Sequence, residues 1–375
     1  MNVLIITSWY PTTDSIYNGV FVREQAKALK TIGMSPIVFY PYDRTLKSKE
    51  LISCEEEGIV TYRANTDYMK NSKVSQLNSI RVAMSMLNQL VKKYKIDVVH
   101  SHVCYPSGFA AALQKKLYGT PYVVTEHMSK VADFSKKKYN RILFKMAYKS
   151  ANKVITVSEF LGEELRSLGY EFSNAVIGNV VDTKDYTINN CKVENNEYNI
   201  AFIGSMINTE VKGHQFFIPA FAEYIKENPD KQLTLNLYAD GVKRAVYEKL
   251  CTDLGISNNC IFHGKVPKSE IAKAIEKNNF LVAPSVKETF GSVIIESMAG
   301  GKPVLATRCG GPNEIIKDFN GVLVEPRNIE ALKNGLDEII NKYNDYDNVR
   351  IKNFVEENYG YRAIGEKLLK IYSEI

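Results

Sequence analysis

The same alternation of strand-like and helical segments occurs twice along this chain of 375 residues, and it limits the fold more than any other feature. Short apolar runs of strand length alternate with amphipathic helical stretches, which is the pattern of βαβ units. Such units form a parallel sheet that helices cover on both faces. The pattern therefore predicts an α/β fold with two Rossmann-like, doubly wound domains. The expected strands are residues 3–7, 36–40, 98–100, 122–125 and 154–157 in the first half, and 198–203, 233–238, 260–263, 280–283 and 303–306 in the second.

A polar stretch over residues 184–198 separates the two halves, because it is rich in asparagine and poor in large apolar side chains. A chain of this length also exceeds what one hydrophobic core normally organises. We therefore expect a first domain over residues 1–185 and a second over 186–352, facing each other across a cleft. In open parallel sheets, ligands bind beyond the carboxyl ends of the strands, so functional residues are expected in the loops that follow strands.

The sequence carries no sign of export or membrane insertion. It has no run of 18 apolar residues, so no transmembrane helix is expected. The apolar N-terminal run has no basic segment before it and is interpreted as a strand instead of a signal peptide. Six cysteines occur without a CxxC pair, which favours reduced thiols over disulfides or a zinc site. We expect a soluble, cytoplasmic protein.

The net charge of +6 comes from the first half, where residues 1–185 hold 25 Lys and Arg against 17 Asp and Glu. Within residues 136–153, basic residues recur at every fourth position and would form a stripe on a helix, with an apolar stripe beside it. Such a helix could dock on an anionic membrane. A solvated face over a core-facing one explains the pattern equally well, and both interpretations stay open. The basic stripe comprises Lys137, Arg141, Lys145, Lys149 and Lys153, and the apolar stripe Tyr139, Ile142, Leu143, Met146 and Ala147.

Signatures of several nucleotide-dependent reactions are missing from the sequence. It has no GxxxxGK[ST] and no GxGxxG after the first strand, so P-loop phosphoryl transfer and dinucleotide-dependent hydride transfer lose support. The histidines lack an HxxxH spacing, and the DxD at Asp345 and Asp347 lies in a polar run, so we expect no metal. The basic stretch carries no nucleic-acid motif, and we expect no nucleic-acid partner.

Two glutamates, Glu288 and Glu296, stand around a Phe-Gly-Ser turn with seven residues between them. Gly291 is expected to begin a helix there, and the N–H groups of Gly291 and Ser292 at its positive end would bind a diphosphate. The carboxylates would repel this anion unless they bound vicinal hydroxyls, which donate two hydrogen bonds to one carboxylate. A sugar nucleotide carries such hydroxyls on both sides of its diphosphate. For the motif alone, the simpler interpretation is that Glu288 interacts with the helix dipole and that Glu296 is an exposed helix residue.

The sequence around this motif resembles the family 4 glycosyltransferases of the GT-B fold, whose mark is the EX7E element. The segment ETFGSVIIESMAGGKPVLATRCGGPNEII, followed by NGVLVEP, matches the family pattern at almost every marked position. The resemblance covers nearly the whole chain, from NGVFVREQAKAL near the start through ITVSEFLGEELRSLG and VIGNVVD to AFIGSMINTEVKGHQFFIPAF and IFHGKV. It implies the GT-B architecture and, over residues 353–375, a helical segment that crosses back to the first domain.

The resemblance also implies roles at the matching positions. Glu296 would bind the ribose hydroxyls and Glu288 the hexose hydroxyls of the donor, while Lys212 would contact the diphosphate. His127 would lie beside the reacting sugar, and it forms the expected catalytic pair with Glu288. The other expected donor-binding residues are Gly19, whose backbone approaches the phosphates, Gly264, Lys265 and Val266 at the base, and Phe290, Gly291 and Ser292 in the motif.

The implied activity is transfer of a hexose with retention at the anomeric carbon, without a metal or other cofactor. The expected donor is a nucleoside diphosphate sugar, with UDP placed ahead of GDP. No carboxylate is positioned as a covalent nucleophile, so we expect a front-face displacement in which the leaving diphosphate takes the acceptor's proton. The acceptor is expected on the first domain, where the basic excess suits a lipid-linked glycan at the inner face of a membrane. The expected role is synthesis of a bacterial surface polysaccharide or glycolipid.

The sequence departs from the family pattern after the strand at 198–203. Ser205 stands where the family usually has arginine, and an insertion over residues 206–211 precedes Lys212. One cationic contact to the diphosphate is therefore either absent or supplied elsewhere, with Arg308 and Lys302 as the candidate substitutes. The alternative function is therefore a catalytically silent partner that stabilises or anchors an active transferase. An epimerase or sugar hydrolase would need an acid/base pair in the cleft, and a phosphorylase would need a lysine for pyridoxal phosphate and a longer chain; neither is identified.

Overall fold

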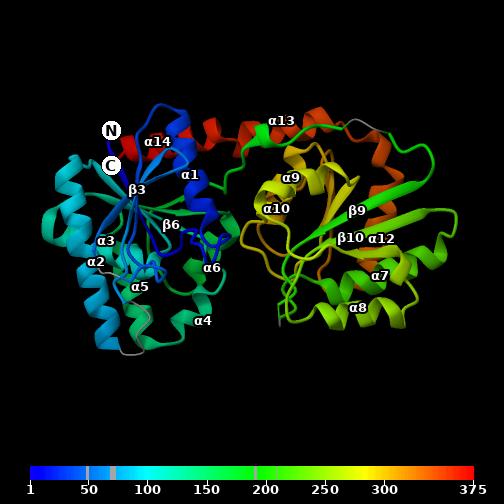
Figure 1. Cartoon of the computed structure of the whole chain (residues 1–375), viewed down its shortest axis with the longest axis horizontal. Coiled ribbons are helices and arrows are strands. Elements are labelled where there is room, and N and C mark those ends of the chain that lie inside the picture. Colours follow the sequence, from blue (N-terminus) through cyan, green and yellow to red (C-terminus); the bar gives the residue numbers. More distant parts are fainter. Residues whose placement is uncertain (48–49, 68–72, 190–191, 208) are drawn as a thin grey trace. The chain divides into compact units, whose positions relative to one another are not determined.

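The computed structural model describes residues 1–47, 50–67, 73–189, 192–207 and 209–375. Its contacts divide the chain into two compact units (Figure 1): the first comprises Met1–Val180 and Tyr361–Ile375, and the second Val181–Gly360. The boundaries expected from the sequence, after residues 185 and 352, thus both fall inside the second unit. Residues 353–360 of the expected C-terminal segment belong to the second unit, and only the part from Tyr361 belongs to the first.

The first unit is built on an eight-stranded sheet in the order β3-β4-β2-β1-β5-β6-β7-β8. Neighbouring strands are parallel, except that β3 and β4 form an antiparallel hairpin. The five expected strands are present, and the hairpin and β8 are additional. The strands are β1 (Val3–Thr7), β2 (Ile37–Tyr40), β3 (Ile52–Glu56), β4 (Ile59–Arg63), β5 (Val98–His102), β6 (Tyr122–Glu126), β7 (Lys153–Thr156) and β8 (Asn174–Val176).

Seven α-helices cover this sheet in the part of the chain that the structure describes. The last of them packs against the first, and a Cβ on Gly365 would lie 2.6 Å from the carbonyl oxygen of Ala28, so a glycine is needed at this contact. Ile364 and Leu368 join the same buried cluster as Val22. The helices are α1 (Val20–Thr31), α2 (Lys73–Tyr94), α3 (Phe109–Tyr118), α4 (Val131–Ser135), α5 (Lys138–Ser150), α6 (Glu159–Ser167) and α14 (Tyr361–Ser373).

The second unit is built on a parallel six-stranded sheet in the order β11-β10-β9-β12-β13-β14. The strands are β9 (Glu197–Ile203), β10 (Gln232–Tyr238), β11 (Cys260–Phe262), β12 (Phe280–Ala283), β13 (Val304–Thr307) and β14 (Gly321–Val324). The helices are α7 (His214–Glu227), α8 (Arg244–Asp253), α9 (Lys268–Glu276), α10 (Ser292–Ala299), α11 (Pro312–Ile315), α12 (Ile329–Asn341) and α13 (Asn348–Tyr359).

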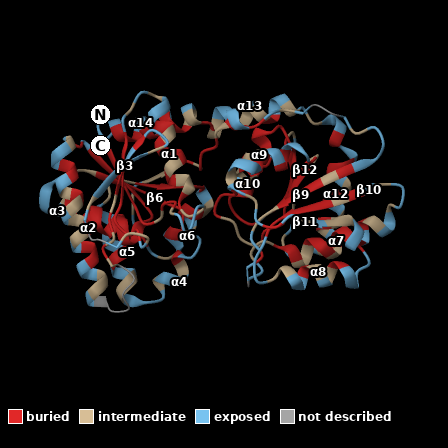
Figure 2. Ribbon diagram, in the orientation of Figure 1, coloured by how far each residue is buried: buried red, intermediate tan, exposed pale blue. Residues whose placement is uncertain are grey.

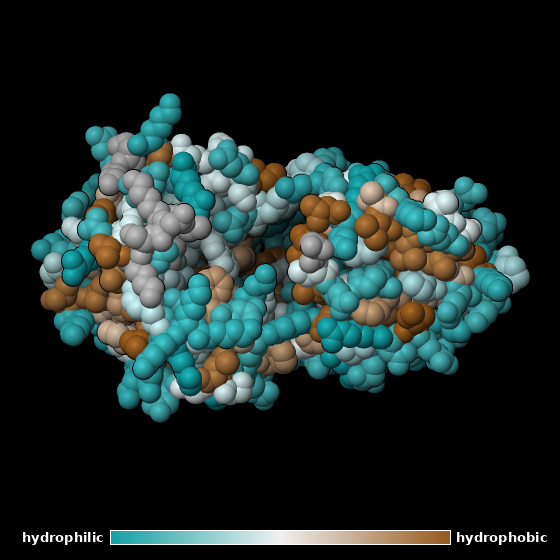
Figure 3. Space-filling model, turned by 90° about the horizontal axis from the view of Figure 1, so that it is seen from below, coloured by the Kyte–Doolittle hydropathy of each residue, from teal (hydrophilic) through white to brown (hydrophobic). Residues whose placement is uncertain are grey.

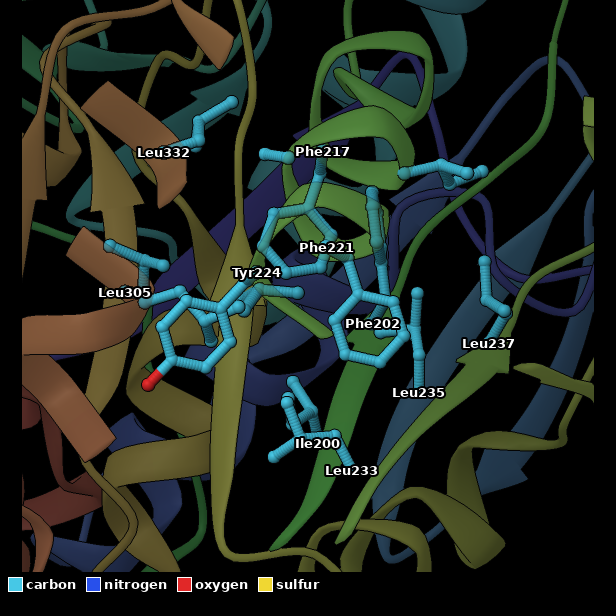
Figure 4. Packing of buried hydrophobic residues seen from close by; sticks show 14 of the residues in the cluster. Ile200, Phe202, Phe217, Phe221, Tyr224, Leu233, Leu235, Leu237, Leu305 and Leu332 are labelled. Atoms are coloured by element: carbon cyan, nitrogen blue, oxygen red, sulfur yellow. The ribbon is translucent and has the colours of Figure 1, made fainter. Parts of the chain in front are cut away.

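Each unit has its own hydrophobic core between sheet and helices, and the buried residues follow the strands (Figure 2). In the second unit, Phe217 and Phe221 of α7 point toward Phe202 of β9 (Figure 4). Among the described residues, no helix is long and apolar enough to cross a membrane. On the face shown in Figure 3, hydrophilic residues predominate and apolar ones are exposed among them. The predicted fold class, two doubly wound parallel-sheet domains, is confirmed.

The strand order of each sheet reverses once, and this reversal locates the ligand crevices. In the first unit the chain turns at β1, which lies between β2 and β5; in the second it turns at β9, between β10 and β12. Ligands bind in open α/β sheets at such switch points, beyond the carboxyl ends of the strands. The loops after β1, β5 and β6, and those after β9 and β12, are therefore the places to look for function.

Candidate functional site

In the second unit, the loop between β12 and α10 carries the Glu288 motif and is fixed through its backbone. Glu288 donates its N–H to the carbonyl of Cys309 at 3.0 Å, and its own carbonyl accepts from the N–H of Gly311 at 2.9 Å. The N–H of Val286 donates to the carbonyl of Val211 at 2.8 Å. The loop after β12 is therefore tied to the loops after β9 and β13, which holds Glu288 at the carboxyl edge of the sheet.

Gly291 lets α10 begin directly after this loop. Its φ of 101° and ψ of 58° lie in the left-handed region, and a Cβ there would lie 2.8 Å from Cδ1 of Ile294. The N-cap residue is Gly291, which has no side chain that could cap α10 by a hydrogen bond. An anion would therefore bind the backbone N–H groups and the positive end of this helix without competing with a side chain of the N-cap residue.

Lys212 and Glu288, two of the expected site residues, form an ion pair here. Nζ of Lys212 lies 2.8 Å from Oε2 of Glu288, and the side chains are 29% and 21% exposed. The next residue, Gly213, lies so close to the loop after β12 that a Cβ on it would be 1.8 Å from the carbonyl oxygen of Pro284. This close contact fixes the backbone beside Lys212. A Cβ on Gly291 would lie 3.7 Å from Cγ of Glu288. The site thus combines one cation, one carboxylate and one helix start.

His214, which sequence reasoning missed, lies behind Lys212 at the start of α7. Its ring stacks between Phe202 and Tyr247, with centroid separations of 4.1 and 4.9 Å. Burial, with the nearby charge of Lys212, lowers the pKa of His214 to about 3. His214 is therefore neutral at pH 7 and supports Lys212 through packing. The only sequence signal for it was its position after Gly213, which does not distinguish it from a surface histidine.

The other expected donor-site residues of the second unit are placed as follows. Glu296 lies half-buried on α10. Phe290 is 4% exposed, and its ring packs edge-on against Tyr359 at 5.5 Å, which leaves donor contacts to its backbone. Gly264, with a φ of 77°, follows β11 and lies against the guanidinium of Arg244, since a Cβ there would be 3.3 Å from Nη1. Lys265 is exposed and Val266 half-buried in the same loop.

The two candidate substitutes for the missing arginine differ in position. Ser205 is exposed after β9. Arg308 follows β13 at the carboxyl edge, and its Nε lies 3.5 Å from Oε1 of Glu325. Lys302 is 4% exposed and lies between α10 and β13, where it lines a cavity with Asn199. Because α10 starts at the carboxyl edge and runs away from it, Lys302 lies at the amino edge. The expectation that Lys302 could contact the diphosphate is wrong.

In the first unit, Gly19 is required by the close approach of the two ends of the loop between β1 and α1. It precedes α1 with a φ of 69°, and a Cβ would lie 2.2 Å from the carbonyl oxygen of Trp9. As the N-cap residue of α1, Gly19 has no side chain that could cap the helix by a hydrogen bond. Gly19 therefore has a packing role of its own, and it leaves the start of α1 open to an anion.

His127 follows β6, and its ring is buried and hydrogen-bonded. Nε2 lies 3.0 Å from Nδ1 of His102, and the ring stacks on Phe21 at 4.0 Å. Burial, with a smaller contribution from His100, lowers the pKa of His127 to about 3. The imidazole is therefore neutral at pH 7, which suits hydrogen bonding to a sugar but not the donation of a proton from a charged ring.

Glu126, also missed by sequence reasoning, organises the loop that carries His127. Its Oε1 accepts from the N–H groups of His127 and Met128 at 2.9 and 2.8 Å, and its Oε2 accepts from the N–H of Cys104 at 3.0 Å and from the hydroxyl of Tyr148 at 2.7 Å. Burial raises the pKa of Glu126, while these hydrogen bonds favour its charged form. One carboxylate thus joins the loops after β5 and β6.

A second buried histidine supports this arrangement from β5. Nδ1 of His100 lies 2.6 Å from the hydroxyl of Tyr372, and its Nε2 lies 2.6 Å from Oγ1 of Thr125. Its ring stacks on His102 at 4.4 Å. Burial lowers the pKa of His100 to about 3 and that of His102 well below its usual value.

These pKa values predict that the protein loses stability in mild acid. A buried histidine that stays neutral in the folded protein takes up a proton only when the protein unfolds. Below pH 6.5 this protonation favours the unfolded state, so the free energy of unfolding falls as the pH decreases toward 3. Each such histidine is expected to cost about 1.4 kcal/mol by pH 5.5. The first unit holds three of them, His100, His102 and His127, and the second holds His214. Burial also lowers the pKa of His263 in the second unit, although this side chain is exposed.

Hydrogen exchange at pH 7.5 and pH 5.5 measures this loss separately in the two units. We expect the free energy of opening of the first unit to fall more than that of the second. The variant His214→Asn provides a control, because it should reduce the pH dependence of the second unit alone. Equal opening energies at both pH values in both units would contradict the prediction.

The basic stretch of the first unit forms α5 and the turns beside it. Leu143 and Ala147 are buried, so part of the expected apolar stripe faces the core. Ile142 and Met146 are 51% and 44% exposed, and they lie next in sequence to the exposed Arg141 and Lys145. No acidic residue occurs between positions 133 and 159. The helix therefore combines a core-facing side with an exposed surface that is both apolar and basic.

Comparison with known proteins covers both units. Residues 186–354 match the family model described as glycosyl transferases group 1, and residues 19–185 match the model described as glycosyltransferase family 4. An uncharacterized glycosyltransferase of Methanocaldococcus jannaschii is 29% identical over 91% of this chain and 89% of its own length. The putative teichuronic acid biosynthesis glycosyltransferase TuaC of Bacillus subtilis is 25% identical over 88% of this chain and 87% of its own.

Solved structures share the fold at lower identity. The crystal structure of HepE from Anabaena in complex with UDP aligns over 100% of both chains, with a TM-score of 0.77 and 19% identity.

Proposed function

The chain belongs to glycosyltransferase family 4, and on this premise we propose that it is a retaining, metal-independent enzyme that transfers a hexose from a UDP-sugar to a lipid-linked glycan. That it is a glycosyltransferase follows from the family; the donor, the stereochemistry and the acceptor are the proposal. The observation that carries it is the ion pair of Lys212 and Glu288 beside the start of α10, whose N-cap residue is Gly291. UDP is chosen ahead of GDP because HepE, which shares the fold, was crystallised with UDP.

Each group of this site has a part in binding the donor. The N–H groups at Gly291 and Ser292 and the ammonium of Lys212 bind the diphosphate, and Glu296 binds the ribose hydroxyls. Glu288 binds the hexose hydroxyls. The ion pair supports the assignment of Lys212 to the diphosphate and of Glu288 to the hexose, because Lys212 can bind phosphate while its charge still offsets that of Glu288. Gly264, Lys265 and Val266 bind the base through the backbone of the loop after β11, while Gly19 and His127 contribute from the first unit.

Transfer proceeds by a front-face displacement. The acceptor hydroxyl attacks the anomeric carbon while the bond from that carbon to the diphosphate oxygen breaks on the same face, and the diphosphate takes the hydroxyl proton. Lys212 and the start of α10 stabilise the negative charge that develops on the diphosphate. Neutral His127 accepts a hydrogen bond from the sugar or donates one to it. A departing group stabilised in this way needs no metal, which supports the metal-independent mechanism.

Thermal unfolding of the purified chain with UDP, GDP and the corresponding sugar derivatives tests the donor site. A ligand at 100 times its dissociation constant contributes about 2.7 kcal/mol, enough for a visible shift in Tm. We expect UDP to stabilise the protein more than GDP, and Glu296→Ala to abolish the shift. If no nucleotide shifts the Tm, the alternative of a catalytically silent partner of another transferase becomes the better interpretation.

The exposed surface of α5 is proposed to hold the enzyme at an anionic membrane, where a lipid-linked acceptor resides. Ile142 and Met146 would enter the interface while Arg141, Lys145 and Lys149 bind lipid head groups. We expect the wild type to sediment with vesicles that contain phosphatidylglycerol and to be released by salt. The variant Lys145→Glu/Lys149→Glu should lose this binding.

A charge reversal elsewhere on the first unit serves as the control. Lys370→Glu on α14 changes an exposed lysine away from α5 and should leave vesicle binding nearly unchanged. Equal loss in both variants would mean that net charge, and not the α5 surface, accounts for the binding.

A further inference from the structure

The first unit contains a cavity of about 600 Å³ that the donor site does not use. It opens among the loops that follow β1, β2, β5 and β6, at the place where the strand order of the sheet reverses. Ser8 and Trp9 line it after β1, Tyr42 after β2 and Met128 after β6. Its position is that of a ligand site in an open parallel sheet, and its size is within the range of small-molecule pockets.

The lining of this cavity is aromatic and neutral. Six of the 15 lining residues carry aliphatic hydroxyl or amide groups, three more are tyrosines with phenolic hydroxyls, and only Asp14 and Arg44 are charged. Asn18 and Gln76 are among the neutral ones. The aromatic lining residues are Trp9, Tyr40, Tyr42, Tyr105 and Phe134. A ligand that fits must therefore present an apolar face and several hydrogen-bonding groups without a strong charge.

Arg63, which lies next to the lining residue Tyr40, is already paired with carboxylates. The guanidinium of Arg63 donates to Asp43 at 2.7 Å, to Glu56 at 2.5 and 2.8 Å, and to the carbonyl of Pro11 at 2.8 Å. It also lies 5.9 Å from the ring centroid of Tyr40. Arg63 thus supports a wall of the cavity while two carboxylates neutralise it. Among the lining residues that the structure describes, the exposed Arg44 is the one cation that could bind a phosphate ligand, whereas phosphate sites usually combine several such donors.

The loops around the cavity are also held together. The hydroxyl of Ser8 lies 3.0 Å from that of Ser107, and it accepts from the N–H of Ser107 at 3.1 Å. This joins the loop after β1 to that after β5. The cavity is therefore preformed, which lowers the entropy cost of binding.

We propose that this cavity binds a neutral sugar residue of the acceptor, and that the enzyme extends an existing glycan instead of starting one on a phosphate group. The proposal rests on the proposed function and adds the chemical class of the acceptor. The C–H face of a pyranose packs on aromatic rings while its hydroxyls bind neutral polar side chains, which matches this lining. A preceding glycosylation must then supply the acceptor. The basic surface of α5 lies outside the lining, so membrane contact and sugar recognition are separate.

Transfer assays with different acceptors and the purified full-length protein test the assignment. The probes are octyl glycosides of glucose, galactose, mannose and N-acetylglucosamine, compared with octyl phosphate, in reactions with UDP-sugars. We expect at least one glycoside to accept the hexose and octyl phosphate to be inert. Transfer to octyl phosphate, or failure of all four glycosides in a protein that still binds UDP, would overturn the sugar assignment. If UDP does not bind either, the proposed function fails as well.

Two variants link the result to the cavity. Phe134 is 45% exposed, and Gln76 is half-buried, so Phe134→Ala and Gln76→Ala should fold. Each is expected to raise the KM for the glycoside about tenfold and to leave the UDP-induced shift in Tm unchanged. Tyr118→Ala removes a 51% exposed aromatic ring outside the lining and should leave the KM unchanged. An unchanged KM in both cavity variants would place the acceptor elsewhere.

Discussion

Replacing Lys212 with Met is expected to lower kcat/KM for hexose transfer by about 10²- to 10³-fold, the cost of removing one preorganised group that stabilises charge in a transition state. The ammonium of Lys212 lies 2.8 Å from Oε2 of Glu288. Its loss removes the neutralisation of the leaving diphosphate and leaves Glu288 without this partner. The measurement is steady-state transfer with the donor that gives the largest shift in Tm.

The ion pair itself can be tested with a double variant. Glu288→Gln alone should cost a similar factor, and the two changes together should cost less than the product of the single effects, because groups in contact are not independent. Lys226→Met, on the exposed side of α7, is the matched control and should stay within about twofold of the wild type. Wild-type transfer by Lys212→Met would instead assign diphosphate binding to another cation, with Arg308 as the next candidate.

Replacing Gly213 with Ala is expected to have the largest effect on stability. The new Cβ would lie 1.8 Å from the carbonyl oxygen of Pro284, so the loops after β9 and β12 would have to separate. A left-handed backbone costs a non-glycine residue about 1–2 kcal/mol. With the clash added, we expect the free energy of unfolding of the second unit to fall by more than about 3 kcal/mol.

Gly255 gives a control in the same unit. It has a φ of +74°, close to the +76° of Gly213, but a Cβ there meets nothing within 4 Å. Gly255→Ala should therefore show the backbone cost alone, and the difference between the two variants measures the clash. Denaturant unfolding gives both values. Equal costs would mean that the loops separate easily and that Lys212 is not held by this contact.

The strands were predictable where buried apolar runs mark them. β1 and β12 are buried at every position, as expected for central strands of parallel sheets. The hairpin of β3 and β4 escaped prediction because it lies at the sheet edge: β3 is exposed or half-buried throughout and carries Glu55 and Glu56 among few apolar residues. β8 is only three residues long and half-buried. Edge strands of this kind have little of the hydrophobic pattern on which prediction depends.

Part of the site was also predictable, in this case from sequence motifs. Lys212 and Glu288 were expected from separate motifs, and the structure joins them by an ion pair. Glu126 and His214 could not be found from the sequence, because their roles depend on partners such as Tyr148 and Tyr247, which are distant along the chain. The packing of Phe290 on Tyr359 is a tertiary contact of the same kind. A motif names residue types, but burial and pairing arise only when the chain folds.

The position of α14 has a consequence for the order in which this protein folds during synthesis. Residues 181–360, the whole second unit, are made after Val180 and before α14, yet α14 completes the core of the first unit. Tyr372 also supplies the hydrogen bond to Nδ1 of His100. Domains generally fold as units while the chain emerges from the ribosome. Here the first unit to be translated is the last to be completed, so the nascent chain must carry an unfinished core until α14 is released.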